Sequence, residues 1–225
     1  MQTNLCQTPL FLGIKEEELP AILRCLGGQE RRYSRGEVIL PEGVPITKLG
    51  VVRHGKVLME HSDVWGNNSV LGHAASGAVF GEAYACAPEE SLLIRVIAAE
   101  ETTVLFLDMQ RIWNPCSDAC PFHIQLLRNL LTISAKKNLQ LSRRILHTGA
   151  KTIRGRLLSY FSDCSKRAGS RTFSIPYNRQ QLADYLGVDR SAMCSELSKM
   201  QKDGILWYQK NQFRLETAEY KSSCS

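Results

Sequence analysis

A chain of 225 residues, 44% hydrophobic and 22% charged, is long enough for one to two domains with a sizeable buried core. No stretch has the apolar length of a membrane span, and the N-terminal MQTNLCQTPLF lacks a basic region followed by an apolar run, so we expect no membrane segment, no signal peptide and a cytoplasmic location. The net charge is +6. From Gly149 onward lie 13 of the 28 Lys and Arg but only 7 of the 22 Asp and Glu. Such an excess of positive charge is expected of a segment that faces phosphates.

The sequence of the first 113 residues predicts an antiparallel β-roll that is preceded by a helical segment. The segment PLFLGIKEEELPAILRCLGG predicts a helix whose apolar face consists of Leu19, Ile22, Leu23 and Leu26. From Arg31 to about Leu107, short apolar or alternating runs such as GEVILPEG, KLGVVRHGKVLME and TTVLFLD are broken by turn residues. This is the pattern of an antiparallel barrel or jelly roll.

A long helical pattern follows from Asn114 to about Leu146 and is too long for an ordinary surface helix. Near a heptad seam lie Leu127, Leu130, Ser134 and Leu141. We therefore expect residues 114–147 to form a dimerisation helix that also connects two domains.

Residues 148–225 predict a winged helix-turn-helix. Asn178 with Gln181 forms a capping box at the start of a short helix, and Gly187 ends that helix. Asp189 is placed to cap a second helix, whose buried stripe is predicted to be Met193, Leu197 and Met200. The segments ILWYQ and QFRL, separated by a short turn, predict the hairpin of the wing. An ordinary αα-hairpin is the alternative interpretation.

The outer face of the second helix is slim, polar and basic, which suits the major groove of DNA. We expect Arg190 to reach a base edge, or alternatively a phosphate only, and Lys199 and Lys202 to contact phosphates. The predicted DNA-binding residues are Arg179, Gln180, Asp189, Arg190, Ser191, Cys194, Ser195, Lys199, Lys202 and Lys210.

The order of preface, roll, long helix and winged helix-turn-helix resembles the Crp/Fnr family of bacterial transcription regulators over nearly the full chain. The resemblance rests on Gly36, Gly43, the turn at Gly55, the triplet FGE and above all on LADYLGVDRSAM. It implies an α+β fold, with a β-roll effector domain and a C-terminal DNA-binding domain. It also implies a homodimer that binds a near-palindromic site on double-stranded DNA, with RNA polymerase as a candidate further partner.

The resemblance departs at the positions that would select an effector. Members that bind cyclic AMP carry an adjacent Arg and Ser after FGE, whereas Leu92 and Leu93 stand near that place here. We therefore expect an unidentified small-molecule effector other than cyclic AMP. The tentative pocket residues are Gly81, Glu82, Tyr84 and Arg95.

Eight cysteines in a cytosolic chain argue against a disulfide framework but leave room for metal or redox chemistry. Only Cys6 and Cys25 precede the roll, which does not match the several clustered N-terminal cysteines of members that hold an iron–sulfur cluster. Cys116, Cys120 and His123 form a second set of soft ligands, and a fourth ligand would have to come from elsewhere. These three residues are either a metal or redox sensor or part of the core.

No catalytic constellation is evident, so we expect a regulator and not an enzyme. The sequence contains no paired histidines of the cupin type, no nucleophile elbow and no phosphate-cradling GxxxxGK loop. A roll protein that does not bind DNA, either an enzyme or a regulatory subunit, is the remaining alternative.

Overall fold

The computed structural model describes residues 3–62, 68–114 and 122–216. The chain forms two compact units, Met1–Lys136 and Lys137–Ser225, and each is described by itself. Within the described residues, no helix combines the length and the apolar character needed to cross a bilayer.

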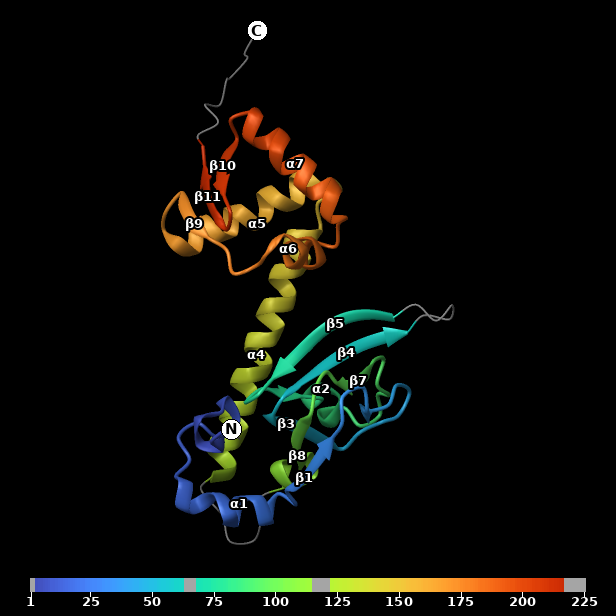
Figure 1. The fold of residues 1–225 in the computed structure, drawn as a ribbon. Coiled ribbons are helices and arrows are strands. Elements are labelled where there is room, and N and C mark those ends of the chain that lie inside the picture. Colours follow the sequence, from blue (N-terminus) through green and yellow to red (C-terminus); the bar gives the residue numbers. More distant parts are fainter. Residues whose placement is uncertain (1–2, 63–67, 115–121, 217–225) are drawn as a thin grey trace. The chain divides into compact units, whose positions relative to one another are not determined.

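The N-terminal unit contains two four-stranded antiparallel sheets (Figure 1). The first sheet has the order β1-β8-β3-β6, and its strands are β1 (Gln29–Tyr33), β8 (Thr102–Asp108), β3 (Lys48–His54) and β6 (Val79–Phe80). The second sheet has the order β2-β7-β4-β5, and its strands are β2 (Val38–Leu40), β7 (Arg95–Ala98), β4 (Lys56–Ser62) and β5 (Asn68–Ala75). This arrangement confirms the predicted antiparallel roll.

The first sheet is buried on both faces, which explains the almost continuous apolar run in β8. Val104 and Phe106 of this strand join a core with residues of the second sheet, whereas Leu105 and Leu107 point to the other face and join a core with helical residues. Successive side chains of a strand alternate between faces, so a strand covered on both sides must be apolar throughout. The roll is therefore packed inside and covered on one outer face.

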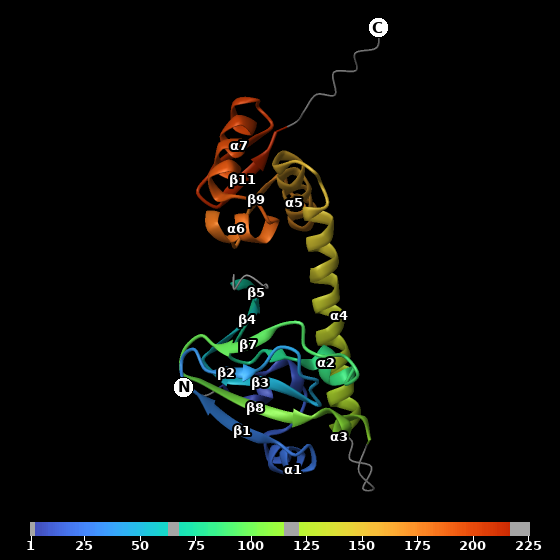
Figure 2. The ribbon, with the colours of Figure 1, turned by 90° about the vertical axis from the view of Figure 1, so that its right-hand side faces the viewer.

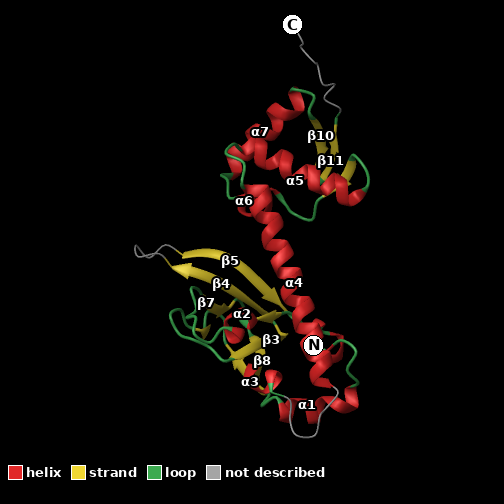
Figure 3. Cartoon of the chain, turned by 180° about the vertical axis from the view of Figure 1, so that it is seen from behind, coloured by secondary structure: helices red, strands yellow, loops and turns green. Residues whose placement is uncertain are grey.

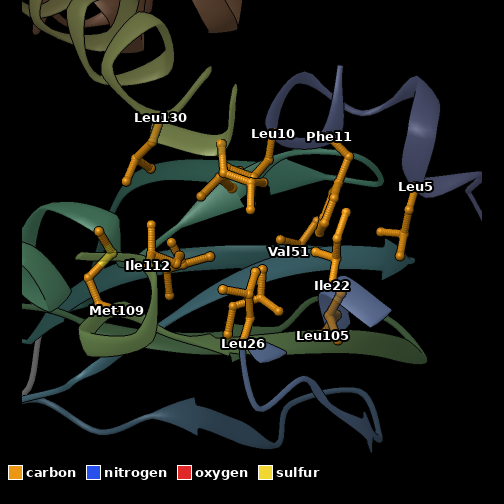
Figure 4. Close-up of a cluster of buried hydrophobic side chains, with 14 of the residues drawn as sticks. Leu5, Leu10, Phe11, Ile22, Leu26, Val51, Leu105, Met109, Ile112 and Leu130 are labelled. Carbon is orange, nitrogen blue, oxygen red and sulfur yellow. The ribbon is translucent and has the colours of Figure 1, made fainter. Parts of the chain in front are cut away.

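Short helices supply that cover. They are the 3-10 turns η1 (Leu5–Gln7), η2 (Pro9–Phe11) and η3 (Glu16–Glu18), together with α1 (Leu19–Cys25), α2 (Glu82–Cys86) and α3 (Met109–Trp113). Leu10, Phe11, Ile22 and Ile112 belong to one buried cluster with Val51 of β3 and Leu105 of β8, and the close-up in Figure 4 shows these side chains.

The long helix α4 (Phe122–Thr148) is one continuous helix (Figure 2), but it differs from the predicted one in two respects. Asn114 does not begin it: this residue has an extended backbone and ends α3, as expected of a residue that precedes a proline. Leu130 is only 4% exposed and packs into the core of the N-terminal unit (Figure 4), so its placement near a dimer seam was wrong.

In its described residues, the C-terminal unit contains the end of α4, three further helices and a three-stranded sheet of order β10-β11-β9 (Figure 3). The elements are α5 (Ile153–Ala168), β9 (Thr172–Ser174), α6 (Arg179–Leu186), α7 (Arg190–Lys202), β10 (Leu206–Gln209) and β11 (Gln212–Leu215). Their apolar faces share one core, and β10 and β11 form the predicted hairpin. This unit is a winged helix-turn-helix, as predicted.

Candidate nucleic-acid interface

One face of α7 is buried and the other is exposed. Met193, Leu197 and Met200 are fully buried, which confirms the predicted stripe. The exposed side of the helix carries Arg190, Ser191, Ser195, Ser198, Lys199 and Lys202. The buried stripe fixes the rotation of α7 about its axis, so this polar and basic face must point to solvent.

The helix that precedes α7 has the predicted caps. Asn178 Oδ1 accepts a hydrogen bond from the backbone N–H of Gln181 at 2.9 Å, and Gln181 Oε1 accepts one from the N–H of Asn178 at 2.9 Å. At its other end, Gly187 has a φ of 63°, a left-handed conformation that glycine adopts at little cost. The sequence therefore fixes both ends of α6.

Asp189 begins α7. Its Oδ1 accepts from the N–H of Ala192 at 2.8 Å and from the hydroxyl of Ser191 at 2.5 Å. These bonds favour the carboxylate and lower the pKa of Asp189, the Ser191 bond having the larger effect. The predicted cap is confirmed, and the Asp189 carboxylate accepts its hydrogen bonds from the first turn of α7.

Arg156 of α5 holds the turn between the two helices and was not predicted from the sequence. Its Nη1 donates to the carbonyl oxygens of Leu186 and Gly187, both at 2.9 Å. Its Nε donates to the carbonyl oxygen of Ala150 at 2.9 Å. These carbonyls lie at a helix end, where no intrahelical donor is available. One guanidinium therefore fixes the path of the chain from α6 to α7.

A second arginine of α5 ties down α7 itself. Arg154 Nε lies 2.5 Å from Glu196 Oε1, and its Nη2 lies 2.8 Å from Asp203 Oδ2. These hydrogen bonds, led by the one to Glu196, raise the pKa of Arg154. Arg154 thus holds α7 at its middle and at its C-terminal end.

An open cavity of about 390 Å³ lies where the starts of α6 and α7 meet the turn of the wing. Its lining residues are Asn178, Arg179, Gln180, Arg190, Lys210 and Asn211. Arg190 and Lys210 are both exposed, and Lys210 takes a left-handed φ of 51° in the turn of the wing. Helix N-termini together with cations favour an anion such as a phosphate.

Three predicted contacts are partly engaged within the protein. Arg179 Nη2 donates to the carbonyl oxygen of Lys210 at 2.8 Å, and its guanidinium lies 5.1 Å from the ring centre of Tyr208. Gln180 donates to Asp184 at 2.8 Å. Cys194 is half-buried against the edge of the core. The more exposed polar residues of α7 are therefore better placed for an external partner.

The last turn of α4 is attached to α6. Arg144 Nε donates to the carbonyl oxygen of Tyr185 at 3.2 Å, and Arg144 Nη2 donates to that of Asp184 at 3.3 Å. His147 is 3% exposed; its Nδ1 lies 2.9 Å from the hydroxyl of Tyr185, and its Nε2 lies 3.5 Å from Asp163 Oδ2. Burial lowers the pKa of His147, an effect that the Asp163 carboxylate partly opposes.

In the roll, most of the residues predicted for an effector pocket already contact other residues of the protein. Arg95 is paired with Glu60, with Nη2 at 3.0 Å from Oε2. Glu82 is buried at the start of α2, directly after Gly81. The Tyr84 hydroxyl accepts from the N–H of Leu93 at 3.4 Å. The one cation among the four predicted residues therefore already has a carboxylate partner.

A cavity of about 220 Å³ lies elsewhere in the roll. It is lined by Gln29, Arg31, Tyr33, Ile39, Leu40, Ile46, Thr47, Lys48 and Phe106. Leu40 and Ile46 also border Gly81, where an added Cβ would lie 3.5 and 3.1 Å from their Cδ1 atoms. The apolar residues of this lining are buried, whereas Gln29, Arg31 and Thr47 are exposed.

Of the three soft ligands predicted from the sequence, Cys116 and Cys120 lie outside the described residues. His123 is 2% exposed, and its Nε2 lies 3.8 Å from Cys25 Sγ. This contact joins residues far apart in the sequence and was not predicted.

Comparisons with known proteins agree with both units. Residues 30–118 match the family described as cyclic nucleotide-binding domain, and residues 155–218 match the Crp-like helix-turn-helix domain. The chain is 27% identical over 213 residues to the probable transcriptional regulator flp of Lacticaseibacillus casei, covering 94% of this chain and 93% of that protein.

Solved structures share the fold. The structure described as OCPA-complexed CprK is 18% identical, with a TM-score of 0.64 over 89% of this chain and 92% of that one. The c-di-GMP-responsive global regulator CLP of Xanthomonas campestris is 20% identical, with a TM-score of 0.56 over 89% of this chain and 100% of that one.

The buried His147 predicts a pH-dependent stability of the C-terminal unit. Because its pKa is lowered on folding, the unfolded chain takes up the proton at a higher pH than the folded unit does. Stability is therefore expected to be complete above the ordinary histidine pKa of 6.5 and to fall as the pH drops through that value toward the folded pKa. Urea unfolding followed by Trp207 fluorescence, in a Trp65→Phe, Trp113→Phe background, measures this unit alone.

His147→Gln is expected to reduce the loss of stability between about pH 7.5 and pH 5.5. Tyr185→Phe is the matched control, since it removes the hydroxyl at Nδ1 but keeps the histidine. An equally steep pH dependence in His147→Gln would assign the effect to other groups.

Proposed function

Because the chain belongs to the Crp/Fnr family of DNA-binding transcription regulators, we propose that it acts as a homodimer that binds a near-palindromic duplex with one α7 in each half-site. In this proposal, residues 1–113 sense an effector, residues 114–147 pair the subunits, and residues 148–225 bind DNA. RNA polymerase is the proposed further partner of the DNA-bound dimer.

The exposed polar face of α7 is the observation that carries this proposal. Arg190 is its first residue and shares a cavity with Lys210 of the wing, so base-directed and phosphate-directed donors lie next to each other. Lys199 and Lys202 continue the basic surface along the same helix. A long guanidinium suits a guanine edge, whereas lysines suit phosphates.

An exposed apolar row on α4 supports the proposed dimer. Ile124, Leu131, Leu141 and Ile145 are between 60% and 71% exposed. With Asn138, they follow a heptad in which Ile124, Leu131, Asn138 and Ile145 take one core position and Leu141 the other. An asparagine at such a position fixes the register of two paired helices at some cost in stability.

We propose that the effector is a small molecule other than a cyclic nucleotide. Leu92 is buried and Leu93 is exposed near the place where a cyclic phosphate would need donors, and Arg95 is paired with Glu60. The cavity lined by Arg31 and Lys48 combines two cations with buried apolar residues, which suits a small organic anion. Effector binding would favour one of two packings of the paired helices and so change DNA affinity.

The test of DNA recognition is Arg190→Ala. After selection of bound duplexes from a randomised library, this variant is expected to bind the selected site roughly 5- to 150-fold more weakly, because about 1–3 kcal/mol of base contact is lost. Its affinity for a scrambled duplex should change little. Fluorescence anisotropy titrations at several salt concentrations measure both.

Lys202→Ala is the matched control on the same helix. It should weaken binding to both duplexes equally and reduce the salt dependence by about one phosphate contact. Equal losses on both duplexes in Arg190→Ala would make Arg190 a phosphate contact. Binding to duplex DNA that does not weaken with salt would contradict the proposed interface.

The test of the dimer is Leu131→Glu. Each dimer would lose two buried leucines worth about 1.5–3 kcal/mol apiece, so its dissociation constant is expected to rise roughly 100-fold or more. Leu139→Glu is the matched control, because Leu139 is also exposed but lies off the heptad seam. Sedimentation equilibrium measures both variants; an unchanged dimer in Leu131→Glu would refute this seam.

The test of the effector proposal is a titration with cyclic AMP and cyclic GMP. We expect neither nucleotide to change the affinity for the selected duplex, since the buried Leu92 and the paired Arg95 offer a cyclic phosphate no adequate partner. The same anisotropy assay serves as readout. A saturable tightening of DNA binding by either nucleotide would overturn the proposal.

A further inference from the structure

Polar residues stand at inward-facing positions of the first sheet. Successive side chains of a strand alternate between its faces, so Gln29 and Arg31 share one face of β1 with Tyr33. On β3, Lys48 shares a face with Val52 for the same reason. Tyr33 and Val52 both belong to the core that joins the two sheets. Two cations therefore continue a face whose other members form this core.

The three polar residues line the roll cavity of about 220 Å³. The buried members of its lining are Tyr33, Ile39, Leu40, Ile46 and Phe106. Among the described residues that line it are none of the four that were predicted for an effector pocket. The cavity is therefore a different site in the same roll.

The two cations of the cavity are not neutralised by the protein. Within residues 3–62, 68–114 and 122–216, no carboxylate forms an ion pair with Arg31 or Lys48. Lys48 Nζ donates to Gln29 Oε1 at 3.3 Å. Asp108 pairs with Lys48 across β3 and β8, but its Oδ1 accepts from the N–H of Gln110 at 2.9 Å. A cleft lined by charges of one sign attracts an ion of the opposite sign.

Tyr33 adds an uncharged donor next to Arg31. It is 8% exposed, and burial raises the pKa of its hydroxyl, an effect that Arg31 partly opposes. The hydroxyl therefore keeps its proton at neutral pH and can donate a hydrogen bond. An anion in the cavity would meet a guanidinium and a hydroxyl side by side.

The lining also limits the rest of the ligand. None of the described residues that line the cavity is acidic, so the ammonium group of an amine or an amino acid would have no partner. Hydroxyl groups of a sugar would lose their hydrogen bonds against Ile39, Leu40 and Ile46. The volume of about 220 Å³ equals that of about seven water molecules at roughly 30 Å³ each. The ligand is thus small, and its body is a hydrocarbon.

We propose that this cavity binds a small carboxylate with a hydrocarbon body, whose head group contacts Arg31 and Lys48. A guanidinium matches a carboxylate through two parallel hydrogen bonds, and an ammonium adds a point charge. The body would lie against the buried side chains of the lining. The inference rests on the proposed effector function and narrows the chemical class of the ligand.

The experiment is isothermal titration calorimetry of the full-length chain, without DNA, with sodium hexanoate as the probe. We expect saturable binding of one hexanoate per chain. From propanoate to hexanoate, each added methylene should tighten binding roughly two- to fourfold, because more apolar surface is buried. The uncharged 1-hexanol and the cationic hexylamine have the same body and should bind roughly tenfold more weakly or worse.

Arg31→Gln and Lys48→Gln should each weaken hexanoate binding roughly 10- to 100-fold, since a charge-assisted hydrogen bond is lost. Arg32→Gln is the matched control. It removes the same charge from the next residue of β1, which is exposed and faces the other side of the sheet. This variant should bind hexanoate as the wild-type protein does.

Four results would overturn the proposal: no saturable binding of hexanoate, equal binding of inorganic phosphate, tighter binding of hexyl phosphate, or an equal loss in Arg32→Gln. The anisotropy assay with the selected duplex, with and without hexanoate, tests the effector role separately. Hexanoate binding that leaves DNA affinity unchanged would support the site and refute its role as effector site. DNA binding itself is measured without hexanoate, so its failure would be seen independently.

Discussion

Burial of one stripe of α7 is the contact on which the DNA-binding unit depends. Met193, Leu197 and Met200 are fully buried, and removing each such side chain from water stabilises the fold by about 1.5–3 kcal/mol. The same contact fixes how far α7 is rotated, and hence which residues face a groove. Stability of the unit and the orientation of its polar face therefore have a common origin.

Features coded by neighbouring residues could be predicted from the sequence. The cap at Asn178, the turn at Gly187, the cap at Asp189 and the apolar run of β8 depend on residues only a few positions apart. The arginine that holds the turn, Arg156, could not be predicted. Arg156 binds backbone carbonyls 30 and 31 residues away. Every residue has such a carbonyl, so the side chains at those positions do not indicate the contact.

The long-range pairings of the roll could not be predicted from the sequence for a similar reason. Glu60 and Arg95 are direct partners across β4 and β7, so their ion pair follows from the strand register, which no short sequence pattern specifies. Leu130 follows the period of a helix face correctly, but only the packed fold decides whether that face meets its own core or another chain. Cys25 and His123 meet for the same reason.

The attachment of the end of α4 to α6 has a mechanical consequence. Arg144 and His147 hold α6 through Asp184 and Tyr185, and Arg156 holds α6 to the turn that starts α7. These hydrogen bonds connect α4 to α6, and α6 to the turn that starts α7. A rotation of the last turn of α4 about its own axis would therefore be transmitted to α6 and, through the turn, to α7. The DNA-facing side of α7 could change its orientation in this way without any helix of the unit unfolding.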